Sequence, residues 1–187
     1  MSVVFDTNMM LLLVDPNVPV PPDPDTGQPV QEPAKRLNHL FATLQKAREK
    51  IIIPTPVLAE LVTLAEKAGP AYVSHFHRYG SVFLIEAFDE RAAVELALMT
   101  TVAKRSSGGL RAGSTESMAK IKFDRQILAI AKVAGAAVIY SDDKNLRQFA
   151  KANNIATTKL AELPLPPEDL QQSIVFPEKN GEPPSHP

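Results

Sequence analysis

The 187-residue sequence has no cysteine and no tryptophan, and only 6% of its residues are aromatic. The absence of cysteine excludes disulfides, thiolate zinc sites and cysteine nucleophiles. The shortage of aromatic rings leaves little capacity for stacking on nucleobases. No apolar run approaches the roughly 18–20 residues of a membrane-spanning helix, and no basic leader precedes the first apolar segment. We therefore expect a soluble cytoplasmic protein with no membrane partner.

Several common catalytic motifs are also missing. The four histidines have no metal-ligand spacing, and the sequence has neither a Gly-x-Ser-x-Gly motif nor a phosphate loop that ends in Gly-Lys-Ser/Thr. The segment Phe-Asp-Thr-Asn at residues 5–8 lacks the second Asp that a phosphatase of the haloacid-dehalogenase type places two residues on. A phosphoacceptor domain gathers Asp at strand ends too, so this class stays open.

Proline marks the predicted boundaries. Seven of the 17 prolines lie in residues 16–33, seven lie in residues 164–187, and three lie between. Proline is excluded from helix interiors and central strands. We therefore predict one domain over residues 1–160, with a proline-rich insertion at residues 15–33, and a proline-rich tail over residues 161–187.

The net charge of −1 is unevenly distributed. Residues 1–33 carry five acids and no Lys or Arg, and residues 163–187 carry four acids and one Lys. The remaining residues, 34–162, hold 19 basic and 12 acidic side chains, a surplus of 7 positive charges. Such a surplus is typical of a protein that binds RNA or DNA, although it is also compatible with ordinary solubilising charge.

Short apolar runs alternate with helical patterns. Strands are predicted at residues 3–5, 51–53, 82–85, 138–140 and 156–158, and helices at residues 9–14, 35–48, 56–67, 89–103, 115–134 and 144–153. The Gly69–Pro70 pair is expected to end the third helix. This alternation predicts an α/β fold with a parallel sheet and helices on both faces.

Acidic residues recur where apolar segments end or turn into helices. They are Asp6, Glu60, Asp124 and the adjacent Asp142 and Asp143. Gathering them in one place is costly unless a divalent cation neutralises them, so the pattern favours an oxygen-ligand metal site. Taken singly, each acid has a simpler explanation: a turn or helix cap for Asp6, Asp142 and Asp143, a solvated helix residue for Glu60, and for Asp124 a salt bridge with Arg125 or Lys120.

Four motifs in order resemble those of the PIN-domain family, which includes VapC-type toxins. They are Asp-Thr-Asn after the first strand, Pro-x-Leu-x-Glu-Leu, Asp-x-x-Ile-Leu-Ala-x-Ala, and Ser-Asp-Asp-Lys-Asn-Leu after a later strand. The resemblance covers about residues 1–158. It implies a three-layer α/β/α fold with a short, mainly parallel central sheet. It also implies a Mg²⁺- or Mn²⁺-dependent ribonuclease that leaves 5′-phosphate and 3′-hydroxyl ends.

Carried over by position, the resemblance assigns the catalytic acids to Asp6, Glu60, Asp124 and Asp143. The implied metal ligands are Asp6, Asp124, Asp142 and Asp143, and the choice between Asp142 and Asp143 as the fourth acid stays open. Asn8 and Ser141 are the implied polar supports. The implied partners are RNA and an antitoxin or other protein, and a homodimer is left open. The insertion and the tail depart from compact toxins of this family.

Basic side chains near the Asp124 helix are the predicted RNA-binding residues. Residues 104–114 form a polar, glycine-containing segment that is either a plain linker or a mobile flap that holds phosphates. The candidates are Lys104, Arg105, Arg111, Lys120, Lys122 and Arg125. The first alternative function is a catalytically inactive PIN-like module for RNA binding or assembly. The second is a phosphoesterase acting on DNA flaps, which usually carries more acids and a helical arch.

Overall fold

The computed structural model describes residues 1–107 and 117–167, with residues 103–107 described by their backbone alone. Most of the predicted basic segment at residues 104–114, including Arg111, lies outside these ranges. The predicted tail beyond residue 167 lies outside them as well.

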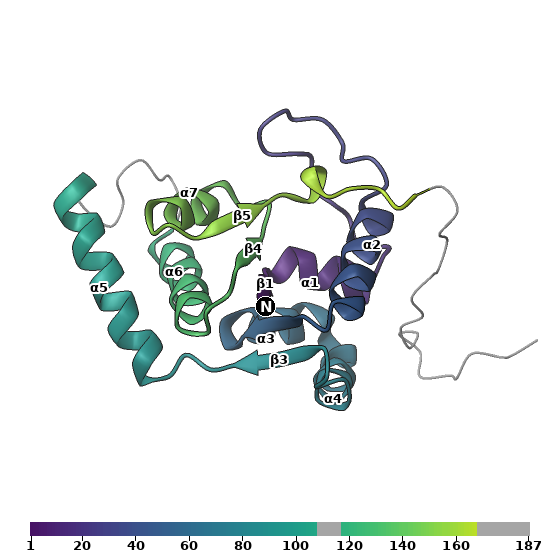
Figure 1. Ribbon diagram of the computed structural model, residues 1–187, viewed down its shortest axis with the longest axis horizontal. Helices are drawn as coiled ribbons and strands as arrows, with labels where there is room; N and C mark the ends of the chain where they lie inside the picture. Colours follow the sequence, from purple (N-terminus) through teal and green to yellow (C-terminus); the bar gives the residue numbers. More distant parts are fainter. Residues whose placement is uncertain (108–116, 168–187) are drawn as a thin grey trace, which may run out of the picture.

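Five strands form one sheet in the order β3-β2-β1-β4-β5, and each neighbouring pair is parallel (Figure 1). The strands are β1 (Ser2–Phe5), β2 (Lys50–Pro54), β3 (Phe83–Glu86), β4 (Val138–Tyr140) and β5 (Ala156–Thr158). The two central runs, Val-Val-Phe in β1 and Ile-Ile-Ile in β2, are buried throughout. Continuous apolar runs of this kind suit strands that are covered on both faces. The predicted α/β fold with a parallel sheet is confirmed.

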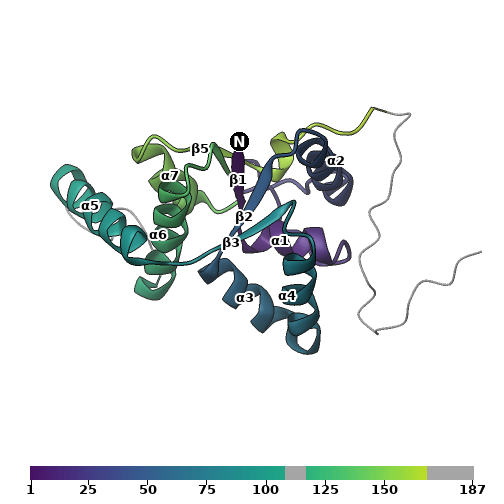
Figure 2. The ribbon, with the colours of Figure 1, turned by 60° about the horizontal axis from the view of Figure 1, so that its bottom comes forward.

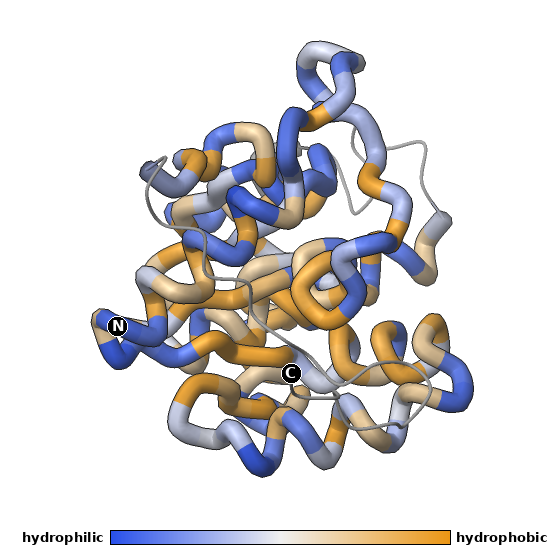
Figure 3. Tube along the Cα trace, turned by 90° about the vertical axis from the view of Figure 1, so that its right-hand side faces the viewer, coloured by the Kyte–Doolittle hydropathy of each residue, from blue (hydrophilic) through white to orange (hydrophobic). Residues whose placement is uncertain are grey.

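Helices flank this sheet and enclose its apolar core (Figures 1 and 2). They are α1 (Thr7–Val14), α2 (Pro33–Lys46), α3 (Thr55–Ala65), α4 (Gly69–Arg78), α5 (Glu90–Ser107), α6 (Met118–Val133) and α7 (Lys144–Ala152), with short 3₁₀ turns η1 (Glu66–Ala68) and η2 (Leu160–Glu162). Figure 3 shows the hydrophobic segments gathered towards the middle of the molecule and the hydrophilic ones towards its periphery. No helix in the described ranges has the length and apolar character needed to cross a membrane.

The Gly69–Pro70 pair begins a helix, where the sequence pattern predicts only the end of one. Proline is favoured at the first positions of a helix because its missing N–H would be unpaired there, and α4 starts at Gly69. A Cβ atom on Gly69 would lie 2.8 Å from Cγ1 of Val62, so only glycine fits where α4 begins against α3. His75 therefore lies within helix α4.

The proline-rich insertion contains no helix or strand between residues 15 and 32, as predicted. Its tip is closed by two backbone hydrogen bonds, from the Asp23 amide to the Gln28 carbonyl at 2.9 Å and from the Gly27 amide to the Asp23 carbonyl at 2.8 Å. Gly27 has a φ of +69°, which glycine adopts without strain. Val18 and Val20 pack against the core, so the insertion is attached to the body of the domain.

Candidate functional site

The order of the strands defines one reversal point in the sheet. From β1 the chain adds β2 and β3 on one side and then β4 and β5 on the other. In open parallel sheets the crevice outside the carboxyl ends of the strands at such a point is the usual ligand site. Here those ends are followed by Asp6 after β1 and by Ser141, Asp142 and Asp143 after β4. The fold thus brings the first and last acidic motifs to the same edge.

Asp6 is a buried carboxylate held by several groups at this edge. Its residue is 5% exposed, and its Oδ1 accepts a 2.9 Å hydrogen bond from the Met9 amide and thereby caps α1. Burial raises the pKa of Asp6 from the ordinary 3.8 to about 7. Hydrogen bonds from the Ser141 hydroxyl and the Met9 amide oppose this rise in pKa, and the charges of Asp142 and Asp143 add to it. The site therefore penalises the ionised form of Asp6 as long as no cation is present.

Ser141 connects Asp6 to the second strand end. It is fully buried, its hydroxyl bonds to the Asp6 carboxylate, and its Oγ accepts a 3.0 Å hydrogen bond from the Asp143 amide. The Asp6 amide also donates to the Tyr140 carbonyl at 3.1 Å, which extends the pairing of β1 and β4 by one residue. The Ser141 hydroxyl therefore joins the Asp6 carboxylate to the backbone that follows β4.

Asp143 caps α7 and forms an ion pair. Its Oδ1 accepts the amides of Asn145 and Leu146 at 2.8 and 2.9 Å, and its Oδ2 accepts a hydrogen bond from the ammonium group of Lys120 at the start of α6. Burial alone would raise the pKa of Asp143, but the hydrogen bond from Lys120 and those from the two amides outweigh it and lower the pKa. Lys120 thus neutralises one of the acids at this edge.

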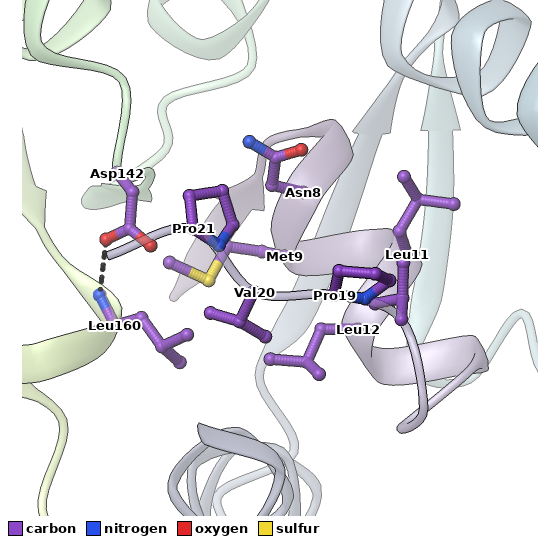
Figure 4. A pocket seen from close by; sticks show the side chains of 10 residues that line it. Asn8, Met9, Leu11, Leu12, Pro19, Val20, Pro21, Asp142 and Leu160 are labelled. Atoms are coloured by element: carbon purple, nitrogen blue, oxygen red, sulfur yellow. Dashed lines mark hydrogen bonds between the residues drawn. The ribbon is translucent and has the colours of Figure 1, made fainter. Parts of the chain in front are cut away.

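Asp142 faces away from this ion pair. Its Oδ1 accepts a 2.9 Å hydrogen bond from the Leu160 amide at the start of η2. Burial raises the pKa of Asp142, and the bond from Leu160 and the charge of Arg147 oppose the rise only in part. Asp142 also lines a small pocket with Asn8, which is exposed on α1 (Figure 4). The two adjacent acids therefore have different surroundings: Asp143 is ion-paired with Lys120, and Asp142 is held by a backbone amide.

Glu60 is exposed on α3. It is held by Thr7, which was not among the predicted site residues. The hydroxyl of Thr7, next to Asp6, donates a 2.6 Å hydrogen bond to Oε2 of Glu60. Thr7 is only 8% exposed, so its hydroxyl has a fixed position on α1. The one sequence feature that could have indicated Thr7 is its position directly after Asp6, at the start of the first helix.

Asp124 and the predicted RNA-binding residues lie on α6. Asp124 is partly exposed and follows Lys120 by four residues, which places both on the same side of the helix, towards Asp143. Lys122 is exposed. Arg125 is 8% exposed, and its guanidinium lies 4.5 Å from the centre of the Phe149 ring. Lys120 and Lys122 are thus the exposed basic residues on this helix, and of these two Lys120 is paired with Asp143. The side chains of Lys104 and Arg105 are not among those described.

A sequence profile of the PIN domain matches residues 3–161. The chain belongs to the PIN-domain family. The match spans all four acidic motifs and all five strands apart from Ser2 at the start of β1, so the resemblance carried by those motifs is confirmed. No curated protein matches the chain.

Solved structures with the same fold come from VapBC complexes. VapBC2 from Rickettsia felis, bound to a DNA fragment from its promoter, superposes with a TM-score of 0.55 at 17% identity over 85% of this chain and 98% of that chain. DNA-bound VapBC from Salmonella typhimurium gives a TM-score of 0.55 at 18% identity over 86% and 98% of the two chains. VapBC-1 from nontypeable Haemophilus influenzae gives 0.51 at 14% identity over the same shares, 86% and 98%. At these identities the likeness concerns the fold.

The acids of this PIN domain are suited to a hard cation by their chemistry, although they do not converge tightly. Within residues 1–107 and 117–167, no three His, Asp or Glu side chains approach closely enough to hold a metal ion. The donors at the strand ends are nevertheless all carboxylate oxygens, which Mg²⁺ and Mn²⁺ prefer. The charges of Asp142 and Asp143 act on the buried Asp6, and a cation there would relieve that repulsion. The residues therefore fit a divalent metal in type and charge, with side-chain movement needed to complete the site.

Proposed function

We propose that this PIN domain is a Mg²⁺- or Mn²⁺-dependent ribonuclease. The observation that carries the proposal is the buried Asp6 at the reversal point of the sheet, destabilised as an anion by its burial and by Asp142 and Asp143. An ionised carboxylate in that setting needs a cation. Membership of the PIN-domain family supports the proposal that this cation serves a nuclease reaction.

The proposed metal ligands are Asp6, Asp124, Asp142 and Asp143, and the proposed catalytic acids are Asp6, Glu60, Asp124 and Asp143. When bound, the metal ion supplies an activated water and neutralises charge on the scissile phosphate.

The chain itself orients these acids. Ser141 directs the Asp6 carboxylate, and Thr7 holds Glu60 beside the start of α1. Lys120 holds Asp143 and must release it, or share it, when a cation enters. Because the pKa of Asp6 is about 7, its proton and a metal ion compete near neutral pH.

The charge of the central region supports RNA as the polyanionic substrate. The surplus of basic residues lies within residues 34–162, and charge of this kind holds phosphates without reading sequence. We assign the strongest phosphate contacts to the exposed Lys122 and to Lys104, Arg105 and Arg111, since Lys120 is engaged with Asp143 and Arg125 packs on Phe149.

A protein partner is part of the proposal. The solved neighbours are VapBC complexes, which supports an antitoxin-like partner for this chain. The insertion at residues 15–33 sets this chain apart from a compact toxin. The pairing would be supported if an adjacent reading frame encodes a small DNA-binding protein and that protein co-purifies with this chain. An isolated gene would argue for a different partner.

Cleavage of a labelled single-stranded RNA tests the function. We expect cleavage in Mg²⁺ or Mn²⁺, none in EDTA, and a loss of about a hundredfold or more in Asp6→Asn and Asp124→Asn. Asp89→Asn is a matched control, because Asp89 caps α5 by accepting the Ala92 amide at 2.9 Å and otherwise has an exposed ion pair with Arg91, and asparagine caps equally well. A substrate panel with DNA decides whether RNA is preferred. Cleavage by both site variants at the wild-type rate would refute the assignment.

The alternative is a PIN-like module that binds RNA without cleaving it. Two observations favour it: the described acids do not form a three-ligand cluster, and Lys120 already neutralises Asp143. A metal-independent RNA complex with no cleavage products in Mg²⁺ or Mn²⁺ would establish this alternative.

A further inference from the structure

The proline-rich insertion forms one wall of the candidate site. Pro19, Val20 and Pro21 line a small pocket whose polar part is formed by Asn8 and Asp142 (Figure 4). Both of those polar residues are among the predicted site residues. The wall itself presents proline rings and an aliphatic side chain, with no charged group among its lining residues. An apolar rim of this kind suits contact with the base or sugar of a nucleotide better than contact with its phosphate.

The buried Lys159, which lies 136 residues further along the chain, binds the insertion through Asp23. The Lys159 ammonium lies 3.0 and 3.1 Å from the two carboxylate oxygens of Asp23, and 2.8 Å from Oδ2 of Asp25. The side chains of Lys159 and Asp23 are only 9% and 10% exposed. Arg147 on α7 adds a second cation, 3.3 Å from Asp25. The ion cluster thus joins the insertion to the end of β5 and to α7.

The same corner of the fold holds Asp142. Lys159 directly precedes Leu160, whose amide donates to Oδ1 of Asp142 at 2.9 Å. The charges of Asp23, Lys159 and Arg147 all act on Asp142. A buried ion pair contributes little net stability because desolvation cancels most of its attraction, but breaking one partner leaves a buried charge without compensation. The ion cluster therefore serves to hold geometry more than to stabilise the fold.

We propose that Lys159 is a positioning residue, which holds the insertion as a fixed wall against Asp142 and so sets how the base or sugar of the RNA is received there. The proposal rests on the ribonuclease function proposed above. Lys159 does not touch the RNA phosphates, because its ammonium is already paired with Asp23 and Asp25. Its removal should weaken RNA binding without altering the salt dependence.

The test compares Lys159→Met with Lys35→Met in the full-length protein. Lys35 pairs with Glu32 at the other end of the insertion, but both of those side chains are about half exposed, at 52% and 47%, so the control removes an ion pair of the surface type. Hydrogen exchange is followed at the Gly27 and Leu160 amides. Binding of a single-stranded RNA is measured at several salt concentrations, with Ca²⁺ in place of Mg²⁺ to limit cleavage.

We expect Lys159→Met to speed exchange at both amides by about tenfold and to weaken RNA binding by about fivefold, with kcat at saturating RNA unchanged. The slope of log affinity against log salt should stay the same, whereas loss of a phosphate contact would make it shallower by about 0.7. Lys35→Met should leave all of these quantities at their wild-type values.

Three results would overturn the positioning role: unchanged exchange, faster exchange with unchanged or tighter RNA binding, or a shallower salt slope. If Lys159→Met does not fold, Asp25→Asn decides by the same criteria, since Asp25 is 44% exposed and the buried Lys159 keeps its pair with Asp23. A wild-type protein that binds no RNA would contradict the proposed function, whereas wild-type binding that Lys159→Met leaves intact would contradict the positioning role alone.

Discussion

The hydroxyl of Thr7 donates a 2.6 Å hydrogen bond to Oε2 of Glu60, and this bond joins residues 53 positions apart in the chain. Thr7 is buried next to Asp6, and Glu60 is exposed on α3. A glutamate on the surface would otherwise sample many rotamers. The bond therefore gives the second acidic motif a defined place beside the first.

Replacing Thr7 with valine should impair activity more than stability. Valine has nearly the same shape and keeps the buried contacts, but it cannot hold Glu60. Without a fixed position for Glu60, cleavage should fall by about tenfold, which corresponds to about 1.4 kcal/mol of lost transition-state stabilisation. The melting temperature should change little, because Glu60 is exposed and stays solvated. Thr7→Ser keeps the hydroxyl and should retain most of the activity. Equal cleavage rates in the valine and serine variants would show that the bond has no role in the site.

Asp6 should make the metal-free protein less stable as the pH rises. Its folded pKa of about 7 lies above the ordinary 3.8, so the folded state binds the proton more tightly than the unfolded chain does. The stabilisation is fully present below about pH 4 and is lost as the pH rises to about 7. Melting temperatures in EDTA at pH 5 and pH 8 measure it: the wild type should fall further than Asp6→Asn. A difference between the two proteins that does not vary with pH would contradict the burial argument.

Lys120 should compete with the metal for Asp143. The lysine neutralises this carboxylate in the metal-free protein, so Lys120→Met should leave the site more negative and increase its affinity for Mn²⁺. Lys122→Met is the control, since Lys122 is exposed two residues further along α6. Titration calorimetry compares the three proteins. A weaker or unchanged Mn²⁺ affinity in Lys120→Met would mean that Asp143 is not a ligand.

The fold could be predicted from the sequence because local patterns determine most of it. The strands are short apolar runs such as Ile51–Ile53, and their neighbours are amphipathic helices, so the parallel arrangement follows from the alternation. The exception is α4. Its Gly69–Pro70 start reads equally well as a helix end, and only the close approach of Gly69 to Val62 distinguishes the two.

The candidate site could be predicted in part. Asp6 and Asp143 follow strands that lie side by side, and strand ends can be read from the sequence. The contacts of Thr7 and Lys159 could not be predicted, because their partners lie 53 and 136 residues away. The ion pair between Lys120 and Asp143 could not be predicted either, because it depends on the turn after β4 that brings Asp143 to α6.

The central claim is that the strand-end carboxylates of this PIN domain hold a divalent cation. The most direct measurement is the melting temperature of the wild type and Asp6→Asn as free Mn²⁺ is increased. A cation that binds only the folded state stabilises it by about 2.7 kcal/mol at 100 times its dissociation constant. The account predicts a rising melting temperature in the wild type and little or no rise in Asp6→Asn. A wild-type melting temperature that does not respond to millimolar Mn²⁺, or one that rises equally in both proteins, would contradict it.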